Sequence, residues 1–291
     1  MIYEKAFAKI NLFLDIESKR QDGYHNIVSV MQTVDWFDEI FIDKSVSGDI
    51  EILMDSENIS CGKDNTAYIA AKKYLSYISD ETGLKIEIHK HIPIAAGMAG
   101  GSADAAAVLR GLNRFFHDRL SQQELLKLGE NIGADVPFCL VGGTKLIKGI
   151  GQEIFPCDNN FPKCPILCAK LGEGVSTPQA YKLLDEIYDD FDGRNIEGEK
   201  LKCLFDEMAR GSAQNASKGF FNIFESAVCK IRPHVTKIKN TMLEHGAFVS
   251  MMSGSGPSVF GLFQNERDAQ TALEQLKKQG AEAKVCYPVE I

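Results

Sequence analysis

The alternation of hydrophobic and polar positions predicts strands over the first third of the chain. Residues 5–16 are apolar and β-branched enough to form a strand. Further strand-like runs follow at 26–34, 38–43 and 49–54. Residues 84–91 alternate with a period of two, which is typical of a half-buried strand. The early part of the chain is therefore expected to build a sheet.

The segments that follow carry helix signals. A helix is expected over 65–77, with Asp64 as its candidate N-cap. A glycine-rich stretch then leads into an alanine-rich helix that ends near Phe116. A strand-like run at 144–155 closes this part of the chain, and the polar stretch 158–162 is the best linker candidate.

The second half of the chain opens with a strand at 165–170. Helices are expected around 177–190, 199–209, 218–230 and 233–244, and the chain closes with a strand, an SGSG turn, a strand, a helix and a strand. Without the extra helices this order is β-α-β-β-α-β, the order of a ferredoxin-like domain. We therefore expect an α+β fold in two domains, residues 1–157 and 158–291.

Composition and charge exclude several classes of protein for this chain. The chain has 291 residues, with 32 basic and 40 acidic side chains and a net charge of −8. Hydrophobic residues make up 44%, which excludes a disordered or fibrous protein. An acidic protein does not bind nucleic acid through its overall field, and no long basic run predicts a membrane anchor. Phosphates can still bind locally, because backbone N–H groups at a helix start need no net positive charge.

The cysteines and the apolar segments indicate the cellular compartment in which the protein acts. Eight cysteines are scattered without any C-x-x-C pair, which favours free thiols in a reducing cytoplasm. Charged residues interrupt the apolar N-terminus, so no signal peptide is expected. The uncharged stretch from Gly246 to Asn265 holds four glycines, four serines and a proline, which indicates two apolar runs around a turn. We expect a cytoplasmic monomer or weak homodimer with no nucleic-acid or membrane partner.

The strongest local signal is the segment from Pro93 to Ala103, which reads PIAAGMAGGSA and joins a predicted strand to a predicted helix. Its glycines permit close approach of a ligand, and the helix start presents free N–H groups to an anion. We interpret it as a phosphate cradle to which Ser102 adds a hydroxyl; a tight strand–helix connection is the alternative. The P-loop, G-x-G-x-x-G and serine-hydrolase motifs are absent from the sequence. His89 and His91 have no nearby third ligand and predict no metal site.

Three other segments supply chemistry that the cradle lacks. Lys9 lies in the apolar run AKINL and Asp135 lies in GADVPF, so both are charges amid apolar neighbours. If the two meet, the carboxylate can accept a hydroxyl proton while the ammonium orients it. The alternatives are a lysine whose ammonium reaches solvent at the sheet rim and a turn or N-cap carboxylate. Residues 253–256, SGSG, form either a second backbone nest for phosphate or a plain hairpin turn.

Three motifs in this order resemble those of the GHMP kinases: AKINL near the start, PIAAGMAGGSADAA in the middle and SGSGPSVF near the end. RQDGYH at 20–25, GADVPF at 133–138 and STPQAY at 176–181 resemble more narrowly the members that act on a cytidine diphosphate ester of methylerythritol. The resemblance runs over about residues 5–288. It implies a two-domain fold, with a ribosomal-protein-S5-domain-2-like N-terminal ATP domain and a ferredoxin-like C-terminal domain.

The resemblance also implies a reaction and its catalytic residues. The expected reaction is ATP-dependent phosphorylation of the 2-hydroxyl of the methylerythritol unit, in the non-mevalonate route to isoprenoid precursors. Lys9 and Asp135 would form the catalytic pair, with Asp135 as the base, and Ser102 would lie near Mg²⁺. The implied ATP-binding residues are Pro93, Ile94, Ala95, Ala96, Gly97, Met98, Ala99, Gly100, Gly101, Ser102 and Ala103, with Asn65 and Lys90 bordering the adenine.

The substrate-binding residues follow from the same resemblance. Tyr24 and His25 would hold the cytosine, which would stack against Tyr181. A planar base favours stacking on aromatic rings, and a histidine can pair with its polar edge. The remaining implied contacts are Asn11 near the reacting hydroxyl, and Thr177 and Pro178 on the opposite wall.

Two positions of the cradle depart from the superfamily, where the loop often reads G-L-G-G-G-S-S. Ala99 adds a methyl group and Ala103 removes a hydroxyl, which leaves the details of phosphate and metal coordination open. Two alternative functions also stay open. One is a GHMP kinase that acts on homoserine, mevalonate or a sugar, and the other is a nucleotide-binding regulator without catalysis.

Overall fold

The structure is a computed structural model that describes residues 1–56, 59–158, 160–188, 191 and 198–291. Within these residues the strands form two sheets. The first holds β1 (Ile2–Lys19), β2 (His25–Lys44), β3 (Ile50–Met54), β4 (Leu84–His89), β5 (Thr144–Lys148), β6 (Glu153–Pro156) and β8 (Phe221–Asn222). The second holds β7 (Ile166–Lys170), β9 (Val249–Met252), β10 (Val259–Leu262) and β11 (Glu282–Cys286).

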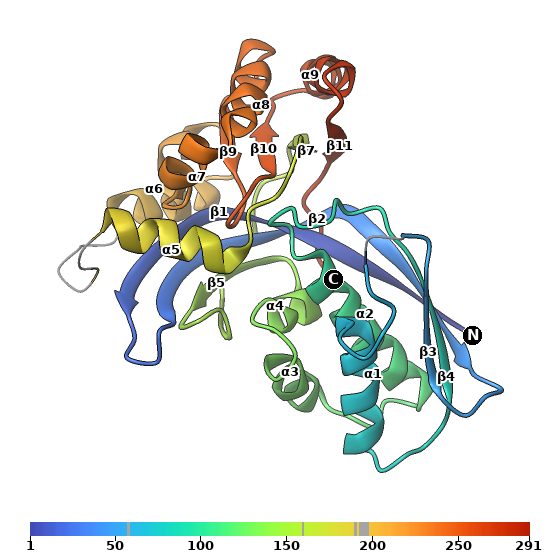
Figure 1. The fold of residues 1–291 in the computed structure, drawn as a ribbon. Helices are drawn as coiled ribbons and strands as arrows, with labels where there is room; N and C mark the ends of the chain where they lie inside the picture. Colours follow the sequence, from blue (N-terminus) through green and yellow to red (C-terminus); the bar gives the residue numbers. More distant parts are fainter. Residues whose placement is uncertain (57–58, 159, 189–190, 192–197) are drawn as a thin grey trace.

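A long hairpin of β1 and β2 is the centre of the first sheet (Figure 1). The two strands pair from Ile2 with Ile42 at one end to Lys19 with His25 at the turn. Along its other edge β2 pairs first with β5 and then with β4, and β3 adds to β4 in parallel. The hairpin thus carries residues from the rim of the sheet into the middle of the molecule.

Four helices cover one side of this hairpin: α1 (Thr66–Tyr77), α2 (Gly100–Phe115), α3 (Gln122–Glu130) and α4 (Val136–Val141) (Figure 1). Four of the ten buried residues of α2 are alanines and one is a glycine, which lets its backbone pack closely on its neighbours. Gly111 shows how close, because a Cβ there would lie 2.6 Å from Cδ1 of Ile42. This packing holds the start of α2 firmly beneath the glycine-rich loop.

The second sheet has the strand order β11-β7-β10-β9, with every neighbouring pair antiparallel. Between β7 and β9 the chain forms α5 (Thr177–Ile187), α6 (Gly198–Ala209), a 3-10 helix η1 (Asn215–Gly219), α7 (Glu225–Ile231) and α8 (Pro233–Glu244), and α9 (Glu266–Lys278) joins β10 to β11. This is the ferredoxin-like order with extra helices. The predicted α+β fold is confirmed.

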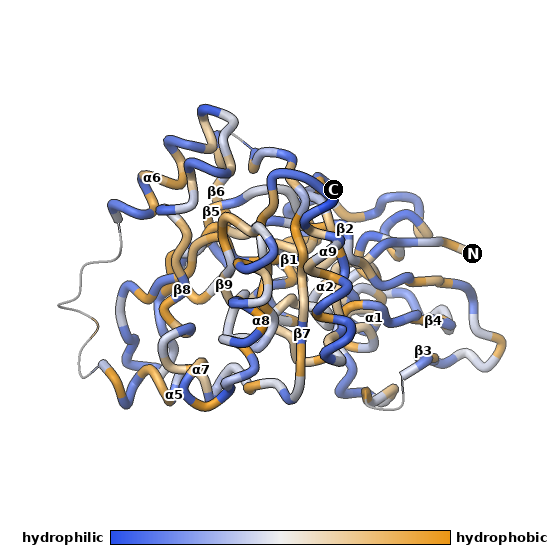
Figure 2. Tube along the Cα trace, turned by 90° about the horizontal axis from the view of Figure 1, so that it is seen from above, coloured by the Kyte–Doolittle hydropathy of each residue, from blue (hydrophilic) through white to orange (hydrophobic). Residues whose placement is uncertain are grey.

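The hairpin contributes to both hydrophobic cores. One core lies between the first sheet and α1–α4 and extends to buried residues of β7, α6, β9, β10 and β11, and the other is built mainly from residues after 166. Leu14, Ile16 and Ile27, at the turn end of the hairpin, belong to the second core. Figure 2 shows hydrophobic segments gathered toward the middle of the molecule and hydrophilic ones on outlying turns. The expected domain boundary at 157/158 falls between β6 and β7, which lie in different sheets, and stays a prediction.

Four local predictions are wrong. The runs 26–34 and 38–43 form one strand, β2, because a register shift opposite it between Phe7 and Lys9 lets pairing continue. The run 144–155 is a hairpin of β5 and β6. The expected helix 218–230 is split, because residues 221–222 pair with β1 as the short strand β8.

The fourth error concerns the start of α1. Its N-cap is Asn65, whose side chain accepts a hydrogen bond from the N–H of Ala67, and not Asp64. The carboxylate of Asp64 instead accepts from Ser60 in the preceding loop. Asn159 of the expected linker and residues 189–190 of the expected helix 177–190 lie outside the described residues.

All eight cysteines are free thiols in the structure, and Cys139, Cys164, Cys168 and Cys286 are buried. Burial raises the pKa of Cys164 to about 12. Among the helices of the described ranges, none has the length and apolar character needed to cross a membrane.

Candidate active site

One large cavity, of about 1080 Å³, lies where the two halves of the molecule meet. Its walls come from segments far apart in the sequence: the middle of β1, the turn of the β1–β2 hairpin, the loop before α2, the start of α4, the start of α5 and the β9–β10 turn. These are the segments that the motifs singled out. The cavity is large enough to hold more than one small molecule, as a two-substrate enzyme requires.

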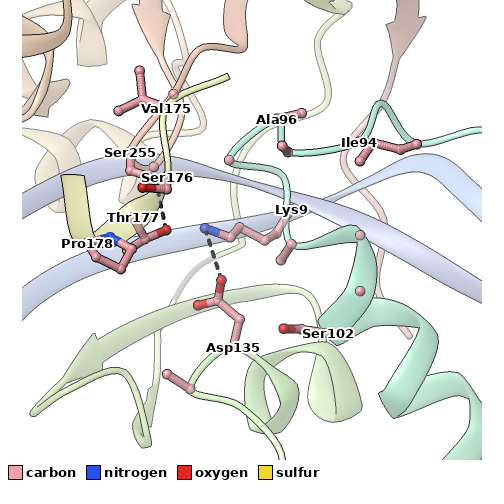
Figure 3. Close-up of a pocket in the computed structure, with 18 of the residues that line it drawn as sticks. Lys9, Ile94, Ala96, Ser102, Asp135, Val175, Ser176, Thr177, Pro178 and Ser255 are labelled. Atoms are coloured by element: carbon pink, nitrogen blue, oxygen red, sulfur yellow. Dashed lines mark hydrogen bonds and ion pairs between the residues drawn. The ribbon is translucent and has the colours of Figure 1, made fainter. Parts of the chain in front are cut away.

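Lys9 and Asp135 meet in the middle of this cavity (Figure 3). The Nζ atom of Lys9 lies 3.5 Å from Oδ2 of Asp135 and donates a hydrogen bond of 2.8 Å to Oδ1 of Asn11. The side chain of Lys9 is only 5% exposed, whereas that of Asp135 is 30% exposed and faces the cavity. The ammonium of Lys9 is thus buried and bonded to neighbouring side chains, whereas the carboxylate of Asp135 is accessible to a ligand.

The backbone explains why the carboxylate of Asp135 is available. Asp135 occupies the N-cap position of α4, but its side chain makes no capping hydrogen bond. An aspartate at this position commonly caps the helix through its own oxygen. Here Pro137 lies in the first turn, where it needs no hydrogen-bond partner for its nitrogen. The side chain of Asp135 is therefore left to face Lys9.

The glycine-rich loop follows β4 and ends at the first turn of α2. Ala95 and Ala99 have left-handed backbone conformations, with φ of 51° and 60°. Such a conformation costs an L-residue about 1–2 kcal/mol, so Ala99 keeps a geometry that glycine adopts more readily. Ala99 also precedes α2 without a side-chain cap, which leaves the N–H groups of Gly100 and Gly101 without helical partners. This loop presents free N–H donors to the cavity, as an anion site requires.

The C-terminal half holds this loop in place. The hydroxyl of Ser253 accepts a hydrogen bond from the N–H of Asn11 and donates one to the carbonyl of Gly97. The N–H of Ser258 donates to the carbonyl of Ala96, and Lys170 donates to the carbonyl of Ile94. The SGSG segment is therefore both the turn between β9 and β10 and a support for the glycine-rich loop.

A buried ionic cluster lies under the loop, and sequence reasoning missed two of its members. Lys90 bonds to both Asp38 and Asp104, and all three side chains are at most 6% exposed. The other carboxylate oxygen of Asp38 accepts hydrogen bonds from the N–H groups of His91 and Ile92. Two carboxylates thus share one ammonium, and burial raises the pKa of Asp104 to about 7. The only signal in the sequence was a charge at position 38 within a β-pattern of apolar residues.

The cofactor-binding predictions can be compared with the geometry. All of the residues predicted around ATP except Met98 and Ala103 line the cavity; those two are buried in the core. Lys90 reaches the cavity wall through the ionic cluster, and Asn65 uses both ends of its amide to cap α1 and bond the carbonyl of Ser60. In the described part of the chain, no three His, Cys, Asp or Glu side chains come together as a metal site.

The hairpin turn and α5 form the other end of the cavity. The ring of Tyr24 is 61% exposed, while His25 is buried and stacks on Tyr181 with ring centroids 4.8 Å apart. A third ring cannot enter between two rings that are already in contact. Tyr24 and His25 both line this end of the cavity, and the predicted stacking of a cytosine on Tyr181 would need the ring of His25 to move away. Thr177 lines the cavity wall next to these rings, and its hydroxyl lies 3.2 Å from the hydroxyl of Ser255 (Figure 3).

Known families match both halves of the chain. The family described as "GHMP kinases N terminal domain" matches residues 65–143, and "GHMP kinases C terminal" matches residues 201–282. A 4-diphosphocytidyl-2-C-methyl-D-erythritol kinase of Caldicellulosiruptor saccharolyticus is 45% identical over 94% of this chain and 92% of its own length. One of Acetivibrio thermocellus is 42% identical over 94% of each.

Solved structures agree with these relatives. A crystal structure of 4-(cytidine 5'-diphospho)-2C-methyl-D-erythritol kinase superposes with a TM-score of 0.81 and 28% identity, covering 99% of this chain and all of the other. A homoserine kinase from Cytophaga hutchinsonii has a TM-score of 0.75 at 20% identity, with 100% of this chain and 95% of the other covered. At that identity the second likeness shows the fold alone.

The fold and the paired domains define a GHMP kinase, an ATP-dependent enzyme that phosphorylates a small molecule. Within that superfamily the chain belongs to the 4-diphosphocytidyl-2-C-methyl-D-erythritol kinases. The predicted family and class of enzyme are confirmed. The roles predicted for individual residues stay predictions.

Proposed function

We propose that this protein transfers the γ-phosphoryl group of ATP to the 2-hydroxyl of 4-diphosphocytidyl-2-C-methyl-D-erythritol, in the non-mevalonate route to isoprenoid precursors. In this reaction the hydroxyl oxygen forms a bond to the γ-phosphorus, the bond from that phosphorus to the β–γ bridging oxygen breaks, and ADP leaves. The observation that carries the proposal is the pair of Lys9 and Asp135, 3.5 Å apart, between the glycine-rich loop and the wall at α5.

Asp135 takes the proton of the hydroxyl, and Lys9 orients the carboxylate. The carboxylate of Asp135 faces the cavity and has no helix-capping bond to give up. The ammonium of Lys9 is fixed by Asn11 as well as by Asp135, so it stays in place while charge develops on the reacting oxygens. Phosphoryl transfer asks the protein mainly for such positioning and charge stabilisation, and no covalent phosphoenzyme is needed.

The loop from Pro93 to Ala103 binds the phosphates of ATP. Its N–H groups at the start of α2 complement the negative charge, which explains how a chain of net charge −8 holds two phosphate-rich ligands. Gly101 adds no side chain to this wall, where a Cβ would lie 3.3 Å from the hydroxyl of Thr66, another residue that lines the cavity. The nucleotide then lies beside Lys90 and Asn65.

Mg²⁺ fits this site as a partner of the nucleotide. Magnesium in kinases is held by substrate phosphates and water, with only one or two protein oxygens. The hydroxyl of Ser102, which lies in the first turn of α2 and lines the cavity, meets that need. When bound, the ion would neutralise charge on the β- and γ-phosphates, with Ser102 as its protein ligand.

The experiment is a side-by-side test of acceptors. The purified protein, with ATP and Mg²⁺, is offered the cytidyl ester, homoserine, mevalonate and galactose, and ADP release and phosphorylated product are measured. Transfer to the cytidyl ester alone supports the proposal. Equal or better transfer to an acceptor without a cytidine group would overturn it, and ATP binding with no transfer to any acceptor would indicate a regulator. We further propose that the protein acts in the cytoplasm, where its eight cysteines stay free thiols, as a monomer or weak homodimer.

A further inference from the structure

The ring of His25 is held from two sides by one face of α5. Tyr181 and Asp185 lie four residues apart on this helix, so their side chains project from the same face. The ring of Tyr181 stacks on that of His25, at an interplanar angle of 22°. The Nε2 atom of His25 lies 2.8 Å from Oδ1 of Asp185.

A lysine completes the arrangement. Lys19 is the residue paired with His25 across the β1–β2 hairpin, and its Nζ donates a hydrogen bond of 2.7 Å to Oδ2 of Asp185. Phe191 packs its ring edge-on against His25. Both carboxylate oxygens are therefore bonded, and the side chain of His25 is only 4% exposed. The imidazole cannot turn without losing the stack on Tyr181 and the bond to Asp185 together.

This contact decides which nitrogen of His25 carries a proton. Burial alone would raise the pKa of Asp185, but the hydrogen bonds from Lys19 and His25 outweigh it and lower the pKa. An ionised carboxylate only accepts hydrogen bonds, so Nε2 of His25 must donate. In the neutral imidazole the other nitrogen, Nδ1, is then an acceptor.

We propose that Asp185, held by Lys19, is a positioning residue that keeps His25 in this tautomer and so makes the cavity selective for cytosine over uracil. Cytosine carries an amino group at C4, which donates to an acceptor nitrogen. Uracil carries a carbonyl oxygen at the same place, which meets the lone pair of Nδ1 with its own. The inference rests on the proposed function, because that function places a cytosine ring at His25.

The test compares CDP with UDP as probes. Binding is measured by calorimetry with a non-hydrolysable ATP analogue at saturation, so that the probes do not enter the nucleotide site of the glycine-rich loop. The variant is Asp185→Asn, and the control is Glu186→Gln, the same change of charge one residue along on the exposed side of α5. An asparagine amide can donate to Nε2 and so permits the proton to move to Nδ1.

We expect the wild-type protein and Glu186→Gln to prefer CDP, and Asp185→Asn to lose about tenfold of that preference while its affinity for the ATP analogue stays unchanged, since one lost discriminating hydrogen bond is worth about that factor. Nitrogen-15 NMR of His25 at pH 8, assigned with His25→Gln, is the second readout. We expect a proton on Nε2 in the wild type and a mixture of tautomers in Asp185→Asn, which a merely structural role would not produce.

The outcomes separate the two proposals. An unchanged ratio of CDP to UDP affinity in Asp185→Asn, or a proton on Nδ1 of His25 in the free wild-type protein, would overturn the role of Asp185 and leave the proposed function standing. A wild-type protein that binds CDP no better than UDP would also overturn this inference, whereas only a lack of phosphoryl transfer to the cytidyl ester would contradict the proposed function itself.

Discussion

Lys9 Nζ lies 3.5 Å from Asp135 Oδ2, and the two side chains reach this position from the middle of β1 and the first residue before α4. Lys9 also bonds to Asn11, two residues farther along β1, but its ionic partner Asp135 comes from a different element. The pair therefore exists only because the hairpin and α4 pack against each other. Its chemistry is the basis of the first prediction.

Replacing Asp135 by asparagine should lower kcat by at least ~100-fold, the lower end of what a positioned acid–base group contributes. The affinity for ATP should change little, because the glycine-rich loop is untouched. Turnover and nucleotide affinity are measured on the same preparation, with Asp118→Asn as an exposed control. Near-normal turnover in Asp135→Asn would remove this carboxylate from the role of base.

Tyr24→Ala should weaken binding of the cytidyl substrate and of CDP, because an exposed ring that stacks on a base contributes about 1–3 kcal/mol. Tyr24→Phe keeps the ring and should retain most of the affinity. Calorimetry with CDP measures both variants, and the thermal midpoint shows that each is folded. Equal affinity of Tyr24→Ala and wild type for CDP would sink the idea that this ring carries the base.

Gly97→Ala should loosen the contact between the glycine-rich loop and the β9–β10 turn. A Cβ at this position would lie 2.4 Å from the carbonyl oxygen of Ser253, and the residue has a φ of +72°. Gly48→Ala is the matched control, because Gly48 has a φ of +81° and nothing within 4 Å of its Cβ position. Both changes carry backbone strain of about 1–2 kcal/mol, but only Gly97→Ala adds a clash.

We expect KM for ATP to rise by at least about tenfold in Gly97→Ala and to stay near the wild-type value in Gly48→Ala, since a misplacement of about 1 Å in a binding loop has large effects on rate and affinity. Steady-state kinetics with varied ATP checks this. A KM for ATP in Gly97→Ala no higher than that in Gly48→Ala would show that the contact between the glycine-rich loop and the β9–β10 turn does not govern ATP binding.

Asp38→Ala should destabilise the fold by about 3–5 kcal/mol, the usual effect of removing one partner from a buried ionic cluster. The change would leave Lys90 with one carboxylate and the N–H groups of His91 and Ile92 without their acceptor. Urea unfolding compares this variant with Asp43→Ala, an exposed carboxylate farther along the same strand, which should have little effect. A midpoint for Asp38→Ala close to that of the wild type would show that the cluster contributes little to the stability of the fold.

Thiol labelling tests the burial of the cysteines. Cys61 is exposed and should react rapidly with a disulfide reagent at pH 8, whereas Cys139, Cys164, Cys168 and Cys286 should react only after denaturation. Their burial blocks access and also disfavours the reactive thiolate, as the pKa of Cys164 near 12 illustrates. Rapid labelling of all eight thiols in the native protein would contradict the core described above.

Local patterns in the sequence were enough to find the glycine-rich loop, the two isolated charges at Lys9 and Asp135, and the ferredoxin-like order of the second half. They failed at β8, because a two-residue strand exists only through its pairing with Phe13 and Leu14 of β1. They also missed Asp38 as a support of the loop. A lone charge in a strand gives no sign of which buried cation it will meet.

The sequence by itself determined which chemical groups are present and which local conformations they favour: free N–H donors at a helix start, a carboxylate beside a proline, and two aromatic side chains near a turn and on a helix. Only the tertiary structure decided their partners. Ser253 bonds to Gly97, Asp185 bonds to His25, and Lys90 lies between two carboxylates because separate elements bury their apolar faces together. Hydrophobic burial is not directional, so it selects no polar partner in advance; the packed geometry does.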